Sequence, residues 1–97
     1  MQSDTDDRVN SDVRASVRLR ADRFALYTRV LGCETDLARA DLLGVTARTI
    51  RRARAGIVGE EFVAKTVAAM QRHEAELAAL GLTTAIDELF EVVEVAA

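Results

Sequence analysis

The chain has 97 residues, of which 49% are hydrophobic, so we expect one domain with one modest core. One cysteine and one histidine argue against an intrachain disulfide and against a Cys/His zinc site, and we expect no metal and no other cofactor. No stretch is apolar over the roughly 18 residues that a membrane span needs, and the first residues are acidic, unlike a signal peptide, so we predict a cytoplasmic protein.

The net charge of −3 hides a strong segregation of charge along the chain. Residues 1–13 have a net charge of −3, residues 14–56 carry ten arginines against four acidic side chains, and residues 57–97 have a net charge of −6. A basic middle between acidic ends is typical of proteins that bind nucleic acid. Every basic residue in this middle is arginine, whose planar guanidinium can bind phosphate or guanine through two hydrogen bonds.

The chain begins with a predicted tail, strand and helix. Residues 1–12 are acidic and lack apolar periodicity, which predicts a disordered tail. Residues 13–20 alternate strictly between apolar and mostly arginine side chains, which predicts a half-buried strand with a basic outer face. Asp22 is the predicted N-cap of a helix over residues 23–31, and Gly32 ends that helix.

Two short helices and one long helix follow in the middle of the chain. Either Thr35 or Asp36 caps a helix that extends to Leu43, and Thr46 caps a second helix over residues 47–55. The third helix opens after a glycine and extends over residues 60–80. Its predicted core-facing side is formed by apolar residues at helical spacing: Val63, Val67, Met70, Leu77 and Leu80. Two i,i+4 ion pairs are expected on the outer side of this long helix: Glu61 with Lys65, and Arg72 with Glu76.

The last segment predicts a short helical turn over residues 84–89 and a strand over residues 90–95. A single strand cannot satisfy its backbone alone, so we expect the two end strands to pair antiparallel, leaving one edge open for a second subunit. The expected fold is mainly α: a bundle of four to five helices with a small antiparallel pair of N- and C-terminal strands. We expect residues 13–97 to form one domain, with a C-terminal segment that serves dimerisation or support.

The most informative stretch is residues 36–56, DLARADLLGVTARTIRRARAG. Ala40 is small where two helices would cross, and Gly44 can adopt the positive φ that a tight turn needs. Thr46 caps the second helix, and Ile50 is its inward-facing anchor. This pattern resembles the helix-turn-helix of the phage Cro/C1-type repressor family, which implies that the expected bundle of four to five helices is a helix-turn-helix bundle.

The resemblance covers about 21 residues and has departures. Arg39 stands where the family often has leucine, with Leu37 nearby as a substitute, and Ala53 stands where a larger apolar residue is common. The run GVTARTIRRARAGIVGEEFVA and the ending LFEVVEV also resemble short regulators of actinobacteria and their phages. This second resemblance implies a bacterial or phage setting.

The family resemblance implies that the second helix of the motif lies in the major groove of DNA. It assigns base edges or nearby phosphates to Thr46, Ala47 and Arg48, and bases or the flanking backbone to Arg51 and Arg52. Thr35 and Asp36 lie at the start of the first helix, where backbone amides can hold a phosphate. Arg54 completes the implied set and faces either a phosphate or solvent.

The function that the resemblance implies is sequence-specific binding of double-stranded DNA as a homodimer, in a transcriptional regulator that represses by covering a promoter. No small-molecule substrate is evident. One alternative is a protein-interaction module, such as an antitoxin or anti-repressor, that binds through the acidic helix over residues 60–80. A second is a non-catalytic recombination accessory factor, although residues 57–61 are too short for the β-wing expected there. An enzyme is disfavoured because His73 has no evident nucleophile beside it and no glycine-rich phosphate loop exists.

Overall fold

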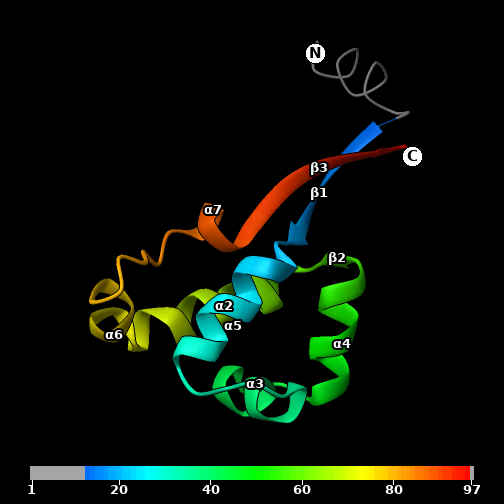
Figure 1. Ribbon diagram of the computed structural model, residues 1–97. Coiled ribbons are helices and arrows are strands. Elements are labelled where there is room, and N and C mark those ends of the chain that lie inside the picture. Colours follow the sequence, from blue (N-terminus) through cyan, green and yellow to red (C-terminus); the bar gives the residue numbers. More distant parts are fainter. Residues whose placement is uncertain (1–12, 97) are drawn as a thin grey trace.

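Two strands from opposite ends of the chain form a ribbon that projects from a cluster of helices (Figure 1). The computed structural model describes residues 13–96, so the predicted acidic tail over residues 1–12 lies outside the described residues. The described part is mainly helical with a small antiparallel sheet, as predicted, but it has six helices where four to five were expected. Its elements are β1 (Val13–Leu19), α2 (Ala21–Val30), α3 (Asp36–Leu43), α4 (Ala47–Ala55), β2 (Ile57–Val58), α5 (Glu60–Arg72), α6 (Glu74–Ala78), α7 (Ile86–Leu89) and β3 (Phe90–Ala96).

The sheet has the strand order β2-β1-β3, and both of its pairings are antiparallel. β1 and β3 pair along their whole length, with Leu19 opposite Phe90 at the base of the ribbon. This confirms the predicted pairing of the first and last strands. β2 is an addition that the sequence did not predict, because two residues are too few to show a period; its Val58 lies opposite Val17.

The core lies where the helices meet the base of the ribbon, and Phe62 of α5 joins its parts. The Phe62 ring centroid is 6.3 Å from that of Phe24 in α2 and 6.3 Å from that of Phe90 in β3. Tilted or edge-on aromatic pairs of this kind contribute about 0.5–1.5 kcal/mol each beyond the area that they bury. The other large side chains that are fully buried here are Tyr27, Ile50, Met70, Leu77 and Leu89.

Two predicted helix starts are wrong. α2 begins at Ala21, so Asp22 lies in its first turn, and Arg20 occupies the N-cap without a side-chain cap bond. Only Arg20 separates β1 from this helix. Its N–H donates to the Leu89 carbonyl oxygen at 2.7 Å, and this hydrogen bond connects the junction to α7. The turn predicted over residues 84–89 is the shorter helix α7, which begins at Ile86.

The long helix predicted over residues 60–80 is in fact two helices. α5 ends at Arg72, α6 begins at Glu74, and His73 lies between them. Neither proline nor glycine is present at the break, and apolar residues continue at helical spacing on both sides of it. The sequence therefore contains no signal that would predict the end of α5. Leu80, which was predicted to end an apolar core face, lies beyond α6 and is 61% exposed.

One of the two ion pairs expected on this helix is confirmed. The Lys65 Nζ lies 3.0 Å from a Glu61 carboxylate oxygen. The pair of Arg72 with Glu76 is wrong, because the break between α5 and α6 separates the two side chains. Arg72 donates instead to a main-chain carbonyl oxygen of α3 at 2.9 Å, and Glu76 contacts the His73 ring at 2.6 Å.

Candidate nucleic-acid interface

The turn between α3 and α4 is held by backbone hydrogen bonds and a side-chain cap. Gly44 has a φ of 76°, and its N–H donates to the Ala40 carbonyl oxygen at 2.8 Å. The Val45 N–H donates to the same oxygen at 3.0 Å. Thr46 is the N-cap of α4, and its Oγ1 accepts the Thr49 N–H at 3.1 Å. These contacts confirm the predicted glycine turn and threonine cap.

The start of α3 decides between the two predicted caps. Thr35 is the N-cap, and its Oγ1 accepts the Ala38 N–H at 3.1 Å. Leu37 is 66% exposed, so its predicted role as a core substitute is wrong. Arg39, which stands where the resembling family often has leucine, makes a polar contact: its Nε donates to the Thr28 Oγ1 at 2.9 Å.

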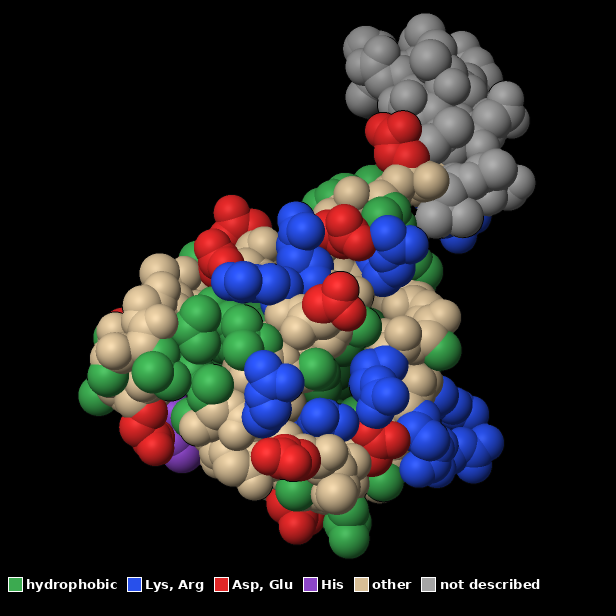
Figure 2. Space-filling view, in the orientation of Figure 1, with side chains coloured by type: hydrophobic (Ala, Val, Ile, Leu, Met, Phe, Trp, Pro, Cys, Tyr) green, Lys and Arg blue, Asp and Glu red, His purple; other side chains and the backbone are tan. Residues whose placement is uncertain are grey.

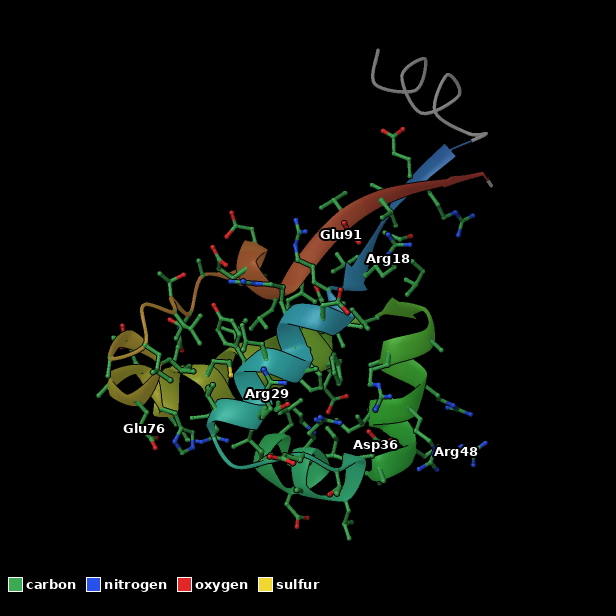
Figure 3. All side chains as sticks on the ribbon, in the orientation of Figure 1. Arg18, Arg29, Asp36, Arg48, Glu76 and Glu91 are labelled. Carbon is green, nitrogen blue, oxygen red and sulfur yellow. The ribbon has the colours of Figure 1, made fainter. Side chains whose placement is uncertain are left out.

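α4 has an inner face in the core and an outer face of arginine. Ile50 and Ala53 are buried, whereas Arg48, Arg51 and Arg52 are exposed. Residues three or four apart are neighbours on a helix surface, so Arg48 lies beside the other two. Figure 3 shows Arg48 pointing away from the body of the protein, and Figure 2 shows basic side chains gathered over α4.

Within residues 13–96, no carboxylate pairs with the three arginines on the outer face of α4. A guanidinium without such a partner keeps its five N–H donors for an external anion. The outer face of α4 can therefore bind phosphate or the acceptor edge of guanine. Other arginines of the basic middle do have carboxylate partners: Arg18, Arg20, Arg23, Arg39 and Arg54.

Asp36 connects the start of α3 to the end of α4 (Figure 3). Its Oδ1 lies 3.5 Å from the Arg39 Nη1 and also contacts the Arg54 Nη1. The pairing holds Arg54 against α3, so this arginine is less free than those on the outer face of α4. The Asp36 carboxylate also opposes a phosphate at the same place, because like charges repel.

The structure gathers the eight predicted site residues on two adjoining helices. Thr46 is exposed and Ala47 is half-buried, and both lie at the start of α4. The Thr46 Oγ1 is 3.0 Å from the Thr49 Oγ1, a contact that fixes the hydroxyl groups of the first turn. The remaining six lie at the start of α3 or along α4: Thr35, Asp36, Arg48, Arg51, Arg52 and Arg54.

A second group of arginines lies beside α4 and was not part of the predicted site. Arg18, Arg20 and Arg23 line one hollow together with Arg54. Arg18 donates to the Glu91 Oε2 at 2.7 and 3.0 Å, and this hydrogen bond lowers the pKa of Glu91 below its ordinary value. The alternation of the first strand shows that it has a basic face, but only the tertiary structure places that face next to Arg54.

The part of the chain that the structure describes holds no group of three or more His, Cys, Asp or Glu side chains that could bind a metal ion. None of its helices has the length and apolarity needed to cross a membrane. Comparison of the chain with protein-family models, with curated proteins and with solved structures finds no match. The site therefore has to be interpreted from its own geometry and charge.

Proposed function

We propose that this chain is a sequence-specific double-stranded DNA-binding protein of the helix-turn-helix kind, with α4 as its recognition helix. The observation that carries the proposal is the outer face of α4, where Arg48, Arg51 and Arg52 are exposed and have no carboxylate partner among the described residues. The resemblance to Cro/C1-type repressors adds support, because the glycine and threonine of that pattern occupy the turn at Gly44 and the cap at Thr46.

In this proposal the start of α4 enters the major groove and its side chains contact base edges. Thr46 and Arg48 contact bases or nearby phosphates, and the methyl group of Ala47 contacts a thymine methyl. Arg51 and Arg52 lie one turn later and reach bases or the flanking backbone. An arginine that binds the O6 and N7 atoms of guanine contributes about 1–3 kcal/mol of discrimination against other bases.

Phosphate contacts fix the position of the protein on the duplex. The backbone amides at the start of α3, next to Thr35 and Asp36, take one phosphate in this proposal, because Arg39 and Arg54 together offset the negative charge of the Asp36 carboxylate. Arg54 takes another from the far end of α4, where its contact with Asp36 already restricts the side chain. The hollow that Arg54 shares with Arg18 extends the basic surface toward the ribbon.

One module of this size reads a short site, so we propose that two copies bind a palindromic sequence. The biological role that fits is a transcriptional regulator that acts as a repressor by covering a promoter. The proposal assigns binding and no catalysis, and it includes no metal, cofactor or small-molecule substrate. The acidic segment after residue 57 carries the contacts between copies, because its charge is unsuited to DNA.

Selection of duplexes from a random library, followed by fluorescence anisotropy on the enriched sequence, tests this function. The expected result is an enriched sequence with two-fold symmetry, bound more tightly than a scrambled duplex of equal length. The affinity should fall steeply with salt, because bound arginines release counterions from the phosphates. Absence of both enrichment and binding at low salt would refute the proposal.

A further inference from the structure

α5 has a second apolar face in addition to the face that it packs into the core. Its core face is formed by the buried residues Phe62, Thr66, Ala69 and Met70. On the adjoining side, Val63 and Val67 are half-buried and pack against the margin of the core, and the alanines beside them, Ala64 and Ala68, are exposed. Surface helices of globular proteins usually carry polar side chains on the face away from the core.

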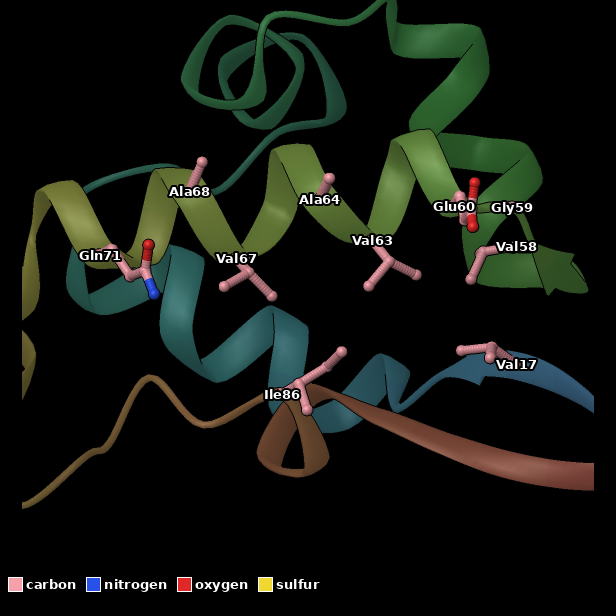
Figure 4. A pocket seen from close by; sticks show the side chains of 10 residues that line it. All are labelled: Val17, Val58, Gly59, Glu60, Val63, Ala64, Val67, Ala68, Gln71 and Ile86. Atoms are coloured by element: carbon pink, nitrogen blue, oxygen red, sulfur yellow. The ribbon is translucent and has the colours of Figure 1, made fainter.

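This second face forms one wall of an apolar groove, which we call the α5 groove (Figure 4). The groove has a volume of about 430 Å³. Its other wall is formed by Val17 of β1, Val58 of β2 and Ile86 of α7, and Ile86 is 54% exposed. The two ends of the α5 wall are polar, with Glu60 at one end and Gln71 at the other.

We propose that the α5 groove is the interface between two copies of this chain, with their α5 helices antiparallel across a two-fold axis. The pattern of side chains on the helix is self-complementary in this arrangement. When Glu60 lies opposite Gln71 of the partner subunit, Val63 lies opposite Ala68 of the partner subunit and Val67 lies opposite Ala64 of the partner subunit. Each valine thus meets an alanine, which lets the two helices interdigitate closely.

The charges of α5 favour the same arrangement. Its first turn carries Glu60 and Glu61, and its last turn carries Arg72. The antiparallel arrangement brings the acidic start of each helix next to the basic end of the other, and it opposes the two helix dipoles. A parallel arrangement would place glutamates beside glutamates. Charge complementarity therefore identifies a second copy of this chain as the occupant of the groove.

This inference specifies the pairing of copies in the proposed function, but it does not depend on DNA binding. Sedimentation velocity of the full chain, without DNA and over a concentration series, tests it. We expect a concentration-dependent dimer. The substitution Ala68→Glu should raise its dissociation constant by at least about tenfold, because each copy would bring an unpaired carboxylate into the interface. The control Ala75→Glu, at an exposed alanine of α6, should leave the dimer unchanged.

A charge exchange tests the antiparallel direction. Glu60→Arg should weaken the dimer by placing arginine next to Arg72 of the partner subunit, and the added substitution Arg72→Glu should restore it. The exposed edge of β3 supplies the competing surface, which Val93→Lys blocks, because Val93 lies on that edge strand opposite Ser16, on the face of the sheet away from Val17 and the groove. Circular dichroism confirms that each variant is folded.

Two results would overturn the inference: a monomer at all concentrations, or a dimer that survives Ala68→Glu but is lost in Val93→Lys. A wild-type dimer that is sensitive to Ala68→Glu but binds no DNA would support the α5 interface and refute only the proposed function. The two proposals can therefore fail separately.

Discussion

Replacing Arg48, Arg51 and Arg52 with alanine, singly and together, tests whether the outer face of α4 contacts DNA. All three side chains are exposed and lack a carboxylate partner in the described residues, so each substitution should change stability by no more than about 0.5 kcal/mol. If each arginine neutralises one phosphate, each loss flattens the plot of log affinity against log salt by about 0.9, and the triple variant by about 2.7. Between about 50 and about 200 mM salt, that difference corresponds to about a 40-fold change in relative affinity.

Fluorescence anisotropy with a labelled duplex gives the affinities over a salt series, and thermal melting checks that the variants are folded. Arg29→Ala is the matched control, because it removes the same charge from an exposed position on α2, away from α4 (Figure 3). It should leave the salt slope nearly unchanged. If Arg29→Ala lowers the slope as much as Arg48→Ala, DNA responds to the overall charge of the protein and not to α4. If the triple variant binds like the wild type, the recognition-helix assignment is wrong.

Three further predictions concern the contacts that hold the site in place. Thr46→Ala should lower the free energy of unfolding by about 1 kcal/mol, because the Thr49 N–H loses its acceptor; an unchanged urea midpoint would contradict this. Ile50→Ala should lower it by about 2–5 kcal/mol, because the side chain is fully buried between α4 and the core; urea unfolding with a loss below about 1 kcal/mol would argue against that packing. The hydrogen bond from Arg18 lowers the pKa of Glu91 in the folded state below its ordinary value of 4.5. The pairing therefore stabilises the fold at pH values above 4.5, and this stabilisation is lost as the pH falls through the lower pKa of the folded state. Glu91→Gln should therefore be less stable than the wild type at neutral pH, and the difference should shrink as the pH falls below the ordinary glutamate value; a difference in melting temperature that stays constant with pH would exclude the effect.

The features that could be predicted from the sequence are those set by local contacts. The caps at Thr35 and Thr46 each depend on a hydrogen bond to a residue three positions later, and Gly44 supplies a backbone conformation that other residues avoid. The short strand β2 depends instead on its pairing with the distant strand β1, and the break at His73 follows no local signal. No residue type or period marks them, so sequence reasoning could not locate them.

The candidate site divides in the same way. The arginines on α4 follow from the motif and from helical spacing, because Ile50 fixes which face of the helix is buried. The contact of Asp36 with Arg54 joins residues 18 positions apart and requires α3 and α4 to be packed first. The hollow that brings Arg18 beside Arg54 requires the placement of β1 as well. These contacts are tertiary and leave no local pattern in the sequence.

The pairing of β1 with β3 also affects when the ribbon can form during folding. Val13 lies opposite Ala96, so the ribbon closes only after almost all of the described chain has been synthesised. The turn between α3 and α4 needs only neighbouring residues and can close while the rest of the chain is still being made. Pairing across so long a loop carries a larger entropic cost and is slower than local helix contacts. We therefore expect pairing of the ribbon to be a slower step of folding than closure of the turn between α3 and α4.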